Sequence, residues 1–183
     1  MDREFKKVML ISPDAIKASG DLNINVDDEV IGASIRASQN IYLRDVIGDK
    51  MLDKLQELVY RAIRGEGDNI EEPQNSHYKV FLDEYMKDAL TYKVLSEICV
   101  RIALKIRNAG VVQLSDTNVN PVTLSDIKYL RGQYETYYCD KLNRLTAFLR
   151  DNKKAFPEMD SVGCDDTPKS NAKYGNTGLW LGK

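Results

Sequence analysis

The sequence predicts a mainly helical fold of four amphipathic helices, of which the third and fourth are long. Apolar residues recur at intervals of three and four over four separate stretches, which is the period of a helix with one buried face. Helix-capping residues precede these stretches, and glycines or a proline follow them. We expect a small β-hairpin or loop between the last two helices, and extended arms at both termini.

The chain divides into three predicted regions. An arm or short strand covers residues 1–25, a helical domain covers 26–157, and an extended tail covers 158–183. With 183 residues, of which 43% are hydrophobic, the chain has the size and composition of one globular domain. Within the first arm, the apolar run Val8–Ile11 is followed by Ser12-Pro13-Asp14, which predicts a turn.

The first two helices are predicted from their caps. Asp27 is a suitable N-cap for the first helix, and Gly48 is placed to end it. Asp49 can cap the second helix, which should stop near Gly65. A loop rich in glycine and acidic residues then covers 65–77.

The third helix is predicted from Tyr78 to Ala109, closed by Gly110. At about 1.5 Å per residue it would span about 45 Å, which makes it the expected spine of the domain. The stretch after Gly110 has valines on both sides of the tetrapeptide Ser115–Asn118, a pattern that predicts the hairpin or structured loop.

The fourth helix is predicted to open at Thr123 with Asp126 three residues later, a spacing related to the capping box. It should fade after Asn152, before Pro157. Its apolar stripe consists of Ile127, Leu130, Tyr134, Tyr137, Tyr138, Leu142, Leu145, Phe148 and Leu149.

Composition excludes several classes of protein. The 26 basic and 28 acidic residues give a formal net charge of −2, which argues against a protein that mainly coats nucleic acid. No apolar run reaches the roughly 18 residues of a membrane span. The N-terminal stretch also lacks the cleavage site of a secretory signal.

Motifs for catalysis, metal binding and cofactor binding are absent from the sequence. Cys99, Cys139 and Cys164 form neither a CxxC motif nor an even disulfide set, and the first two lie inside apolar helical patterns, where a free cysteine behaves as a small apolar residue. The single histidine, His77, is expected to be a solvated loop residue with no catalytic partner nearby. Phosphate-binding glycine loops are also missing. We therefore predict no enzyme activity, no cofactor and no metal.

The tail ends in a short apolar segment, Leu179-Trp180-Leu181, after a long polar stretch. Such a segment cannot build a core of its own. It could fold back onto the same chain or anchor in a neighbouring subunit, since tryptophan is enriched at interfaces. A polar spacer before a short apolar segment favours anchoring in a neighbouring subunit. We expect that deletion of residues 176–183 leaves the helical fold intact while weakening assembly.

Several segments together resemble a known group of proteins. The first carries an acidic helix start, an Ile-x-x-x-Ile pair, a Tyr-Leu-Arg-Asp-Val-Ile-Gly end and a Leu-rich second helix, over residues 27–58. The others are the long tract 79–109, the stretches 110–116 and 122–126, and Phe156-Pro157 with the Gly-rich tail. This pattern resembles the head–tail connector, or adaptor, proteins of tailed bacteriophages, and is most similar to the form in Bacteroidetes phages, including the ring proteins of crAss-like phages.

The resemblance implies an adaptor-type helical bundle and a structural virion protein at the phage head–tail interface, made in the host bacterial cytoplasm. Such proteins form a ring in the neck, a dodecamer by the same resemblance. They bind the portal protein and an adjacent neck or tail protein, and touch the packaged DNA weakly and without sequence preference. The alternative is a small helical DNA-binding or regulatory domain of a bacterial or phage protein.

Overall fold

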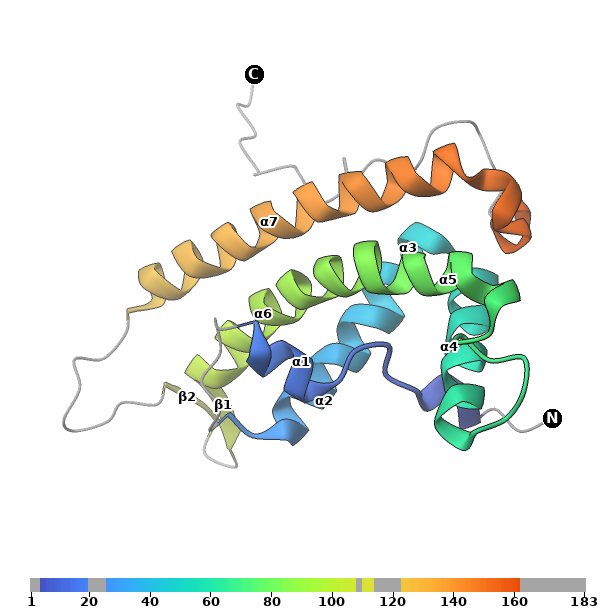
Figure 1. The fold of residues 1–183 in the computed structure, drawn as a ribbon. Coiled ribbons are helices and arrows are strands. Elements are labelled where there is room, and N and C mark those ends of the chain that lie inside the picture. Colours follow the sequence, from blue (N-terminus) through green and yellow to red (C-terminus); the bar gives the residue numbers. More distant parts are fainter. Residues whose placement is uncertain (1–3, 20–25, 108–109, 114–122, 162–183) are drawn as a thin grey trace, which may run out of the picture.

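The structure is a computed structural model that describes residues 4–19, 26–107, 110–113 and 123–161 (Figure 1). The predicted mainly helical fold is confirmed. The α-helices are α1 (Pro13–Ala18), α2 (Asp28–Ala37), α3 (Arg44–Ile47), α4 (Asp49–Arg64), α5 (Ser76–Val80), α6 (Lys87–Ala103) and α7 (Leu124–Asp151). Shorter 3-10 turns lie at Glu4–Lys7, Pro73–Asn75, Lys153–Ala155 and Pro157–Ser161.

Two π-helical segments join pairs of these helices into longer runs. Ser38–Leu43 connects α2 to α3, and Phe81–Met86 connects α5 to α6. Residues 28–47 and 76–103 are therefore helical without a break. The extra residue in a π turn shifts the helix face, and sequence periodicity alone does not reveal such a shift.

Local capping explains where most helices begin and end. The Asp27 carboxylate accepts a hydrogen bond from the Glu29 amide at 2.9 Å, as predicted for the N-cap of α2. Gly65 ends α4 with a φ of 67°, a left-handed conformation that glycine adopts readily. Asp49, however, does not cap α4: Gly48 occupies that position, and the Asp49 carboxylate pairs with Arg44 Nε at 2.9 Å.

The region after α6 differs from the prediction. The helical run of residues 76–103, which corresponds to the predicted third helix, ends at Ala103 and not at Ala109. The chain continues as strand β1 (Leu104–Arg107). This strand pairs antiparallel with β2 (Gly110–Gln113), with Leu104 opposite Gln113. Leu104-Lys105-Ile106-Arg107 alternates apolar and basic residues, a pattern that also suits a strand. Gly110 thus begins a strand and does not close a helix, while the predicted turn at 115–118 lies outside the described residues.

The N-terminal segment also differs in part from the prediction. Ser12-Pro13-Asp14 is not a turn but the start of α1, because the Ser12 hydroxyl accepts a hydrogen bond from the Ala15 amide at 3.2 Å. Pro13 occupies the first helical position, where a missing amide proton costs nothing. Residues 8–12 form neither helix nor strand and carry Leu10 and Ile11 into the core.

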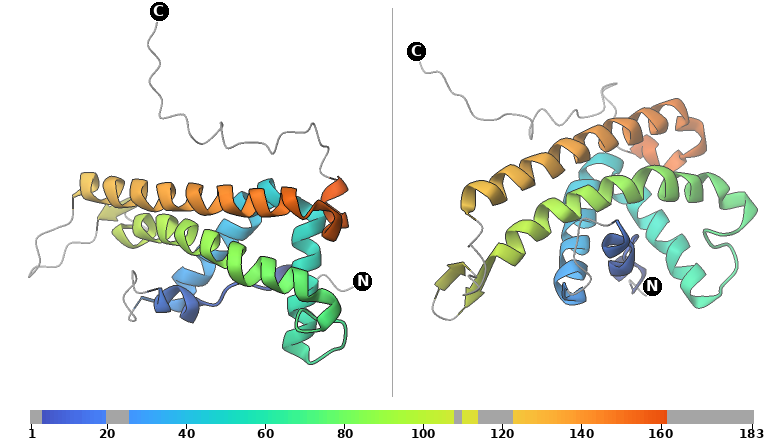
Figure 2. Two further views of the ribbon diagram at one scale, coloured as in Figure 1. Left: turned by 45° about the horizontal axis from the view of Figure 1, so that its top comes forward. Right: turned by 60° about the vertical axis from the view of Figure 1, so that its left-hand side comes forward.

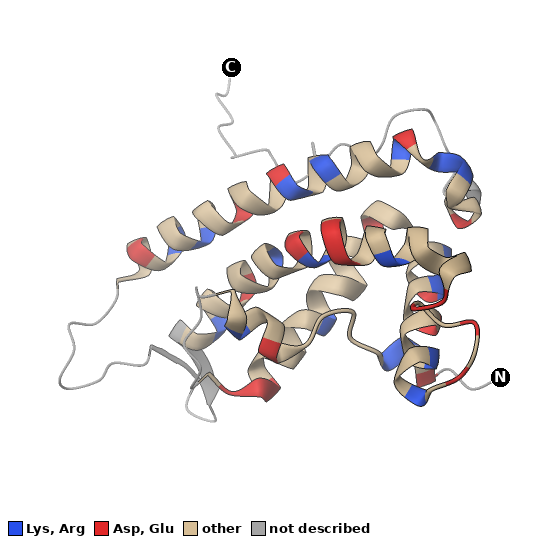
Figure 3. Ribbon diagram, in the orientation of Figure 1, with Lys and Arg blue, Asp and Glu red and all other residues tan. Residues whose placement is uncertain are grey.

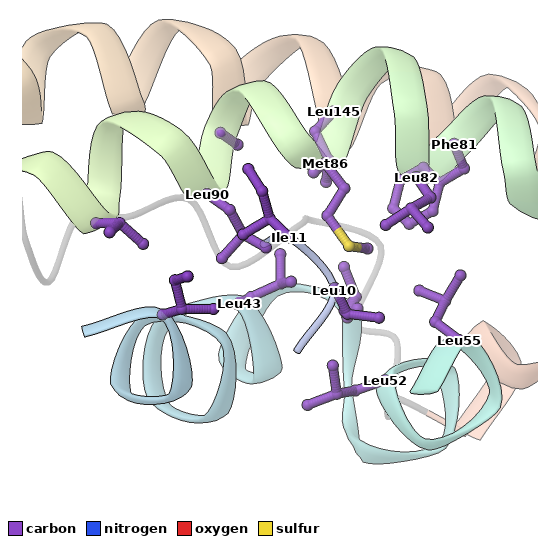
Figure 4. Close-up of a cluster of buried hydrophobic side chains, with 14 of the residues drawn as sticks. Leu10, Ile11, Leu43, Leu52, Leu55, Phe81, Leu82, Met86, Leu90 and Leu145 are labelled. Carbon is purple, nitrogen blue, oxygen red and sulfur yellow. The ribbon is translucent and has the colours of Figure 1, made fainter. Parts of the chain in front are cut away.

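The helices are arranged around α6. The ribbon views show α7 antiparallel to α5 and α6 on one side, with α1 and α2 packed on the opposite side and α4 standing near the α5 end (Figures 1 and 2). Figure 4 shows Leu10 and Ile11 lying between side chains of the third helical run, such as Met86, and those of the helices below, such as Leu52. One continuous apolar core thus joins the N-terminal segment to the helical layers.

Two buried glutamines hold the N-terminal segment in place. Gln39 donates from Nε2 to the Val8 carbonyl at 2.8 Å and accepts from the Leu10 amide at 3.1 Å. Gln56 donates to the carbonyls of Lys6 and Val8, at 3.1 and 3.0 Å. These carboxamides give hydrogen-bond partners to backbone groups at the end of the first 3-10 turn and in the stretch that follows it. The predicted arm is therefore, over its described part, an integral layer of the fold.

Candidate interaction surface

The most distinctive surface of the described chain belongs to α7. This helix begins with a capping box, in which Thr123 Oγ1 accepts from the Asp126 amide at 3.2 Å and the Asp126 carboxylate accepts from the Thr123 amide at 3.1 Å. The pKa of Asp126 is lowered because its carboxylate accepts hydrogen bonds, first from the Thr123 hydroxyl at 2.7 Å and then from the Thr123 amide. The start predicted from Thr123 and Asp126 is thus confirmed, and the helix runs for 28 residues, or about 42 Å.

One edge of the contact between α7 and the helical run of residues 76–103 is lined by three side-chain pairs. The rings of Tyr92 and Tyr137 lie 5.3 Å apart between their centroids. Further along, Lys141 Nζ binds Asp88 at 2.8 Å. Nearest the end of α7, the rings of Tyr85 and Phe148 stack at 4.2 Å. In these pairs the residue numbers on one helix fall as those on α7 rise, because the helices run in opposite directions.

The other edge carries a buried cation. The Lys93 side chain on α6 binds Glu135 of α7 at 2.6 Å and lies 3.6 Å from Glu97. Its Nζ lies 3.8 Å from the centroid of the Tyr42 ring, within the range of a cation–π interaction. Burial raises the pKa of Tyr42, and the negative charge of Glu97 adds to that effect. This cluster links the helical run of residues 28–47, α6 and α7. Its members lie far apart in the sequence, so no sequence pattern predicted that they would meet.

Burial differs sharply along α7. The residues of the helix that are buried are Ile127, Tyr134, Tyr138, Leu142, Leu145 and Leu149. Leu130 and Tyr137, which we predicted as members of the apolar stripe, are 44% and 48% exposed. The reason is that α6 covers only one side of α7, and the stripe is wider than this contact. Together with Tyr92, these two residues form what we call the tyrosine–leucine patch.

A second uncovered surface of α7 consists of Ser125, Tyr129, Gly132 and Thr136, which we call the outer face. All four are exposed, at the spacing of one helical side, and none is charged. The Tyr129 side chain is 70% exposed, and its hydroxyl accepts from Gln133 Nε2 at 2.7 Å. A Cβ atom at Gly132 would meet no other atom within 4 Å. No packing of the described chain therefore requires a glycine there, although glycine weakens a helix interior.

The residues considered for chemistry do not form a reactive site. His77 is not a loop residue, since it lies in α5, half-buried, with its ring 4.2 Å from that of Tyr78 and 5.5 Å from that of Phe156. Both cysteines with described side chains lie in helices as expected, Cys99 half-buried and Cys139 exposed. Burial raises the pKa of both thiols.

Cation sites and membrane spans were searched over the described ranges. There, no group of three or more histidine, cysteine or acidic side chains is placed to hold a metal ion. No helix of that part combines the length and the apolar character that crossing a membrane requires. The predicted anchor residues Leu179, Trp180 and Leu181, and also Cys164, lie outside the described residues.

Sequence reasoning missed the outer face, although one signal was present. A glycine inside an otherwise regular helical pattern, as at position 132, costs helix stability and calls for a reason.

Comparison with known proteins gives a family but no activity. No curated protein matches the chain, and no solved structure matches it. A family model described as a family of unknown function, DUF6712, matches residues 43–169, which include α4 to α7. The chain therefore belongs to the DUF6712 family.

Proposed function

We propose that this chain is a structural virion protein that forms a ring in the phage neck. The ring would join the portal to the next tail component and help to retain packaged DNA. Its partners would be copies of itself, the portal protein and an adjacent neck or tail protein, and its fold would be the adaptor-type bundle of four helices. The resemblance of the sequence to phage connector proteins names this setting, and the surface of α7 supplies a physical reason for assembly.

The observation that carries the proposal is the uncovered outer face of α7. A helix that stands alone against solvent gains nothing from a glycine, whereas a partner chain that approaches closely does, because the missing side chain lets backbones come together. The other three residues of the outer face, Ser125, Tyr129 and Thr136, are also uncharged and so add no cost of burying charge in such a contact. A ring needs two different surfaces on each subunit, so the outer face would meet a different surface of the next copy.

The charge distribution fits weak rather than specific contact with DNA. Figure 3 shows basic residues interspersed with acidic ones along α6 and α7. Many of these charges are paired within the chain, for example Lys141 with Asp88 and Lys87 with Asp83. Scattered cations support a loose hold on phosphates that depends on salt. They give less support to an isolated DNA-binding domain, the alternative function.

Mass photometry and cryo-electron microscopy test the proposal directly. The purified chain is measured alone and after mixing with a portal protein encoded beside it. We expect a ring of many copies, formed either alone or on the portal. A chain that stays monomeric in both conditions contradicts the proposal, and salt-dependent binding of that monomer to DNA in a gel-shift series would favour the alternative.

A pair of glycine variants tests the role of the outer face. Gly132→Arg places a bulky side chain where the isolated chain has open space, so the fold should persist while ring formation fails. Gly67→Arg is the matched control, because a Cβ at Gly67, in the loop after α4, also meets no atom within 4 Å. Equal assembly of both variants would exclude the outer face from the interface.

A further inference from the structure

We propose that Leu179-Trp180-Leu181 of one copy docks on the tyrosine–leucine patch of a second copy. This inference rests on the proposed ring, because it assigns the tail to a neighbouring subunit. It concerns a surface distinct from the outer face, which lies on another side of α7. The patch and the tail would together form a second link between subunits, in addition to the direct contact.

The patch has the properties of a site for an apolar segment. Leu130 and Tyr137 are seven residues apart, so they lie on one side of α7, two turns from each other. The Tyr137 ring lies 5.3 Å from that of Tyr92 on α6, which extends the patch across both helices. Both α7 side chains are nearly half exposed. Covering water-exposed apolar surface with an apolar partner lowers the free energy.

The tail segment has the matching chemistry. It contains the only tryptophan of the chain between two leucines, and the preceding stretch from Gly163 to Gly178 is mostly polar or glycine. Tryptophan combines a large apolar area with favourable contacts to other aromatic rings, so a pair of tyrosines is a suitable platform. A tryptophan with flanking leucines is also the kind of segment that supplies most of the affinity in a small interface.

The spacer is longer than the distance from the end of α7 back to the patch. The described fold ends at Ser161, and seventeen residues, 162–178, separate it from Leu179. Extended at about 3.3 Å per residue, they span about 56 Å. The patch lies about 21 to 32 Å back along α7 from Asp151, at 1.5 Å per residue. The spacer therefore exceeds the return distance along its own helix, so its length permits docking on the patch of the same chain or of a second copy, and the experiment below separates the two.

A complementation experiment tests the docking. The acceptor is the chain without residues 176–183, which keeps the patch and has no tryptophan. The donor is the full-length double variant Leu130→Asp/Tyr137→Asp, which keeps the tail and loses its own patch. Since Trp180 is then the only tryptophan in the mixture, its fluorescence reports on the donor tail alone. We expect the donor emission to shift to shorter wavelength as acceptor is added, with saturation.

Three controls make the result specific. The donor with Trp180→Ala in place of the tryptophan should bind the acceptor at least about thirtyfold more weakly in analytical ultracentrifugation. An acceptor with Ile63→Asp, an exposed apolar residue on α4 outside the patch, should bind the donor normally. Circular dichroism checks that each variant keeps its helices, and a synthetic peptide of residues 176–183, titrated into the acceptor, replaces the donor if the double variant unfolds.

Each outcome decides for or against the proposal. No shift of Trp180 emission with a folded acceptor, by donor or by peptide, overturns it. If the wild-type chain shows short-wavelength emission that is independent of concentration and the mixture shows no shift, the tail docks within its own chain and the proposal is also overturned. Rings formed on the portal by the truncated chain, together with no docking, would remove this inference while leaving the proposed function intact.

Discussion

The two halves of α7 show how differently one regular helix can be used. From Tyr138 to Leu149 the helix buries a side chain at nearly every turn and helps to close the core. From Leu124 to Tyr137 it buries only Ile127 and Tyr134, while two tyrosines and two leucines are exposed. The hydrophobic period continues through both halves, so the difference lies in what covers the helix. The C-terminal half serves the fold, and we infer that the N-terminal half serves assembly.

The largest expected contrast is between two leucines of this helix. Leu145→Ala should lower the free energy of unfolding by about 2 to 5 kcal/mol, because Leu145 is fully buried and its loss leaves a cavity. Leu130→Ala should change it by less than about 0.5 kcal/mol, as expected for an exposed site. Urea denaturation of both variants measures this, and similar losses for the two would break the comparison.

The buried Lys93 should be the main polar residue that holds the middle of α7 against α6. Lys93→Met removes the partner of Glu135 and leaves Ser96 and Glu135 with a reduced network. We expect a loss of about 2 kcal/mol, below the usual cost of breaking a buried pair, since the Glu135 side chain is 32% exposed. The double variant Lys93→Met/Glu135→Leu should recover much of the stability in a thermal-unfolding series. A double variant that is worse than both single variants would contradict this.

Gly132→Ala should act in the opposite direction on the isolated chain. The added methyl group meets no atom within 4 Å and removes the flexibility of glycine from the unfolded state. We expect a gain of about 0.5 to 1 kcal/mol, measured as a higher midpoint of denaturation. A loss of stability would show that the glycine serves the fold of the single chain.

The smallest effect should be seen at the start of α7 as a function of pH. The pKa of Asp126 is lowered in the fold by its bonds to Thr123, so its contribution is present above the ordinary carboxyl pKa of 3.8 and is lost as the pH falls below it. Amide hydrogen exchange in the first turn of α7 should therefore become less protected in acid. Asp126→Asn should remove this pH dependence, whereas persistence of the dependence would implicate another group.

Features that depend on near neighbours in sequence could be predicted, and features that depend on distant contacts could not. Asp27, Gly65 and Thr123 act on residues within one helical turn, so their roles were predictable. The hairpin at 104–113 was placed too late, because a short alternating stretch is compatible with both helix and strand. Leu130 was placed in the apolar stripe, and periodicity marks such a stripe without saying how much of it a neighbouring helix covers.

The two glutamines that grip the N-terminal segment have an evolutionary consequence. They bind main-chain groups at Lys6, Val8 and Leu10. Substitutions of the side chains at positions 6 and 8 therefore leave these hydrogen bonds in place, whereas substitutions of either glutamine remove them. Related chains should accordingly retain or lose Gln39 and Gln56 as a pair.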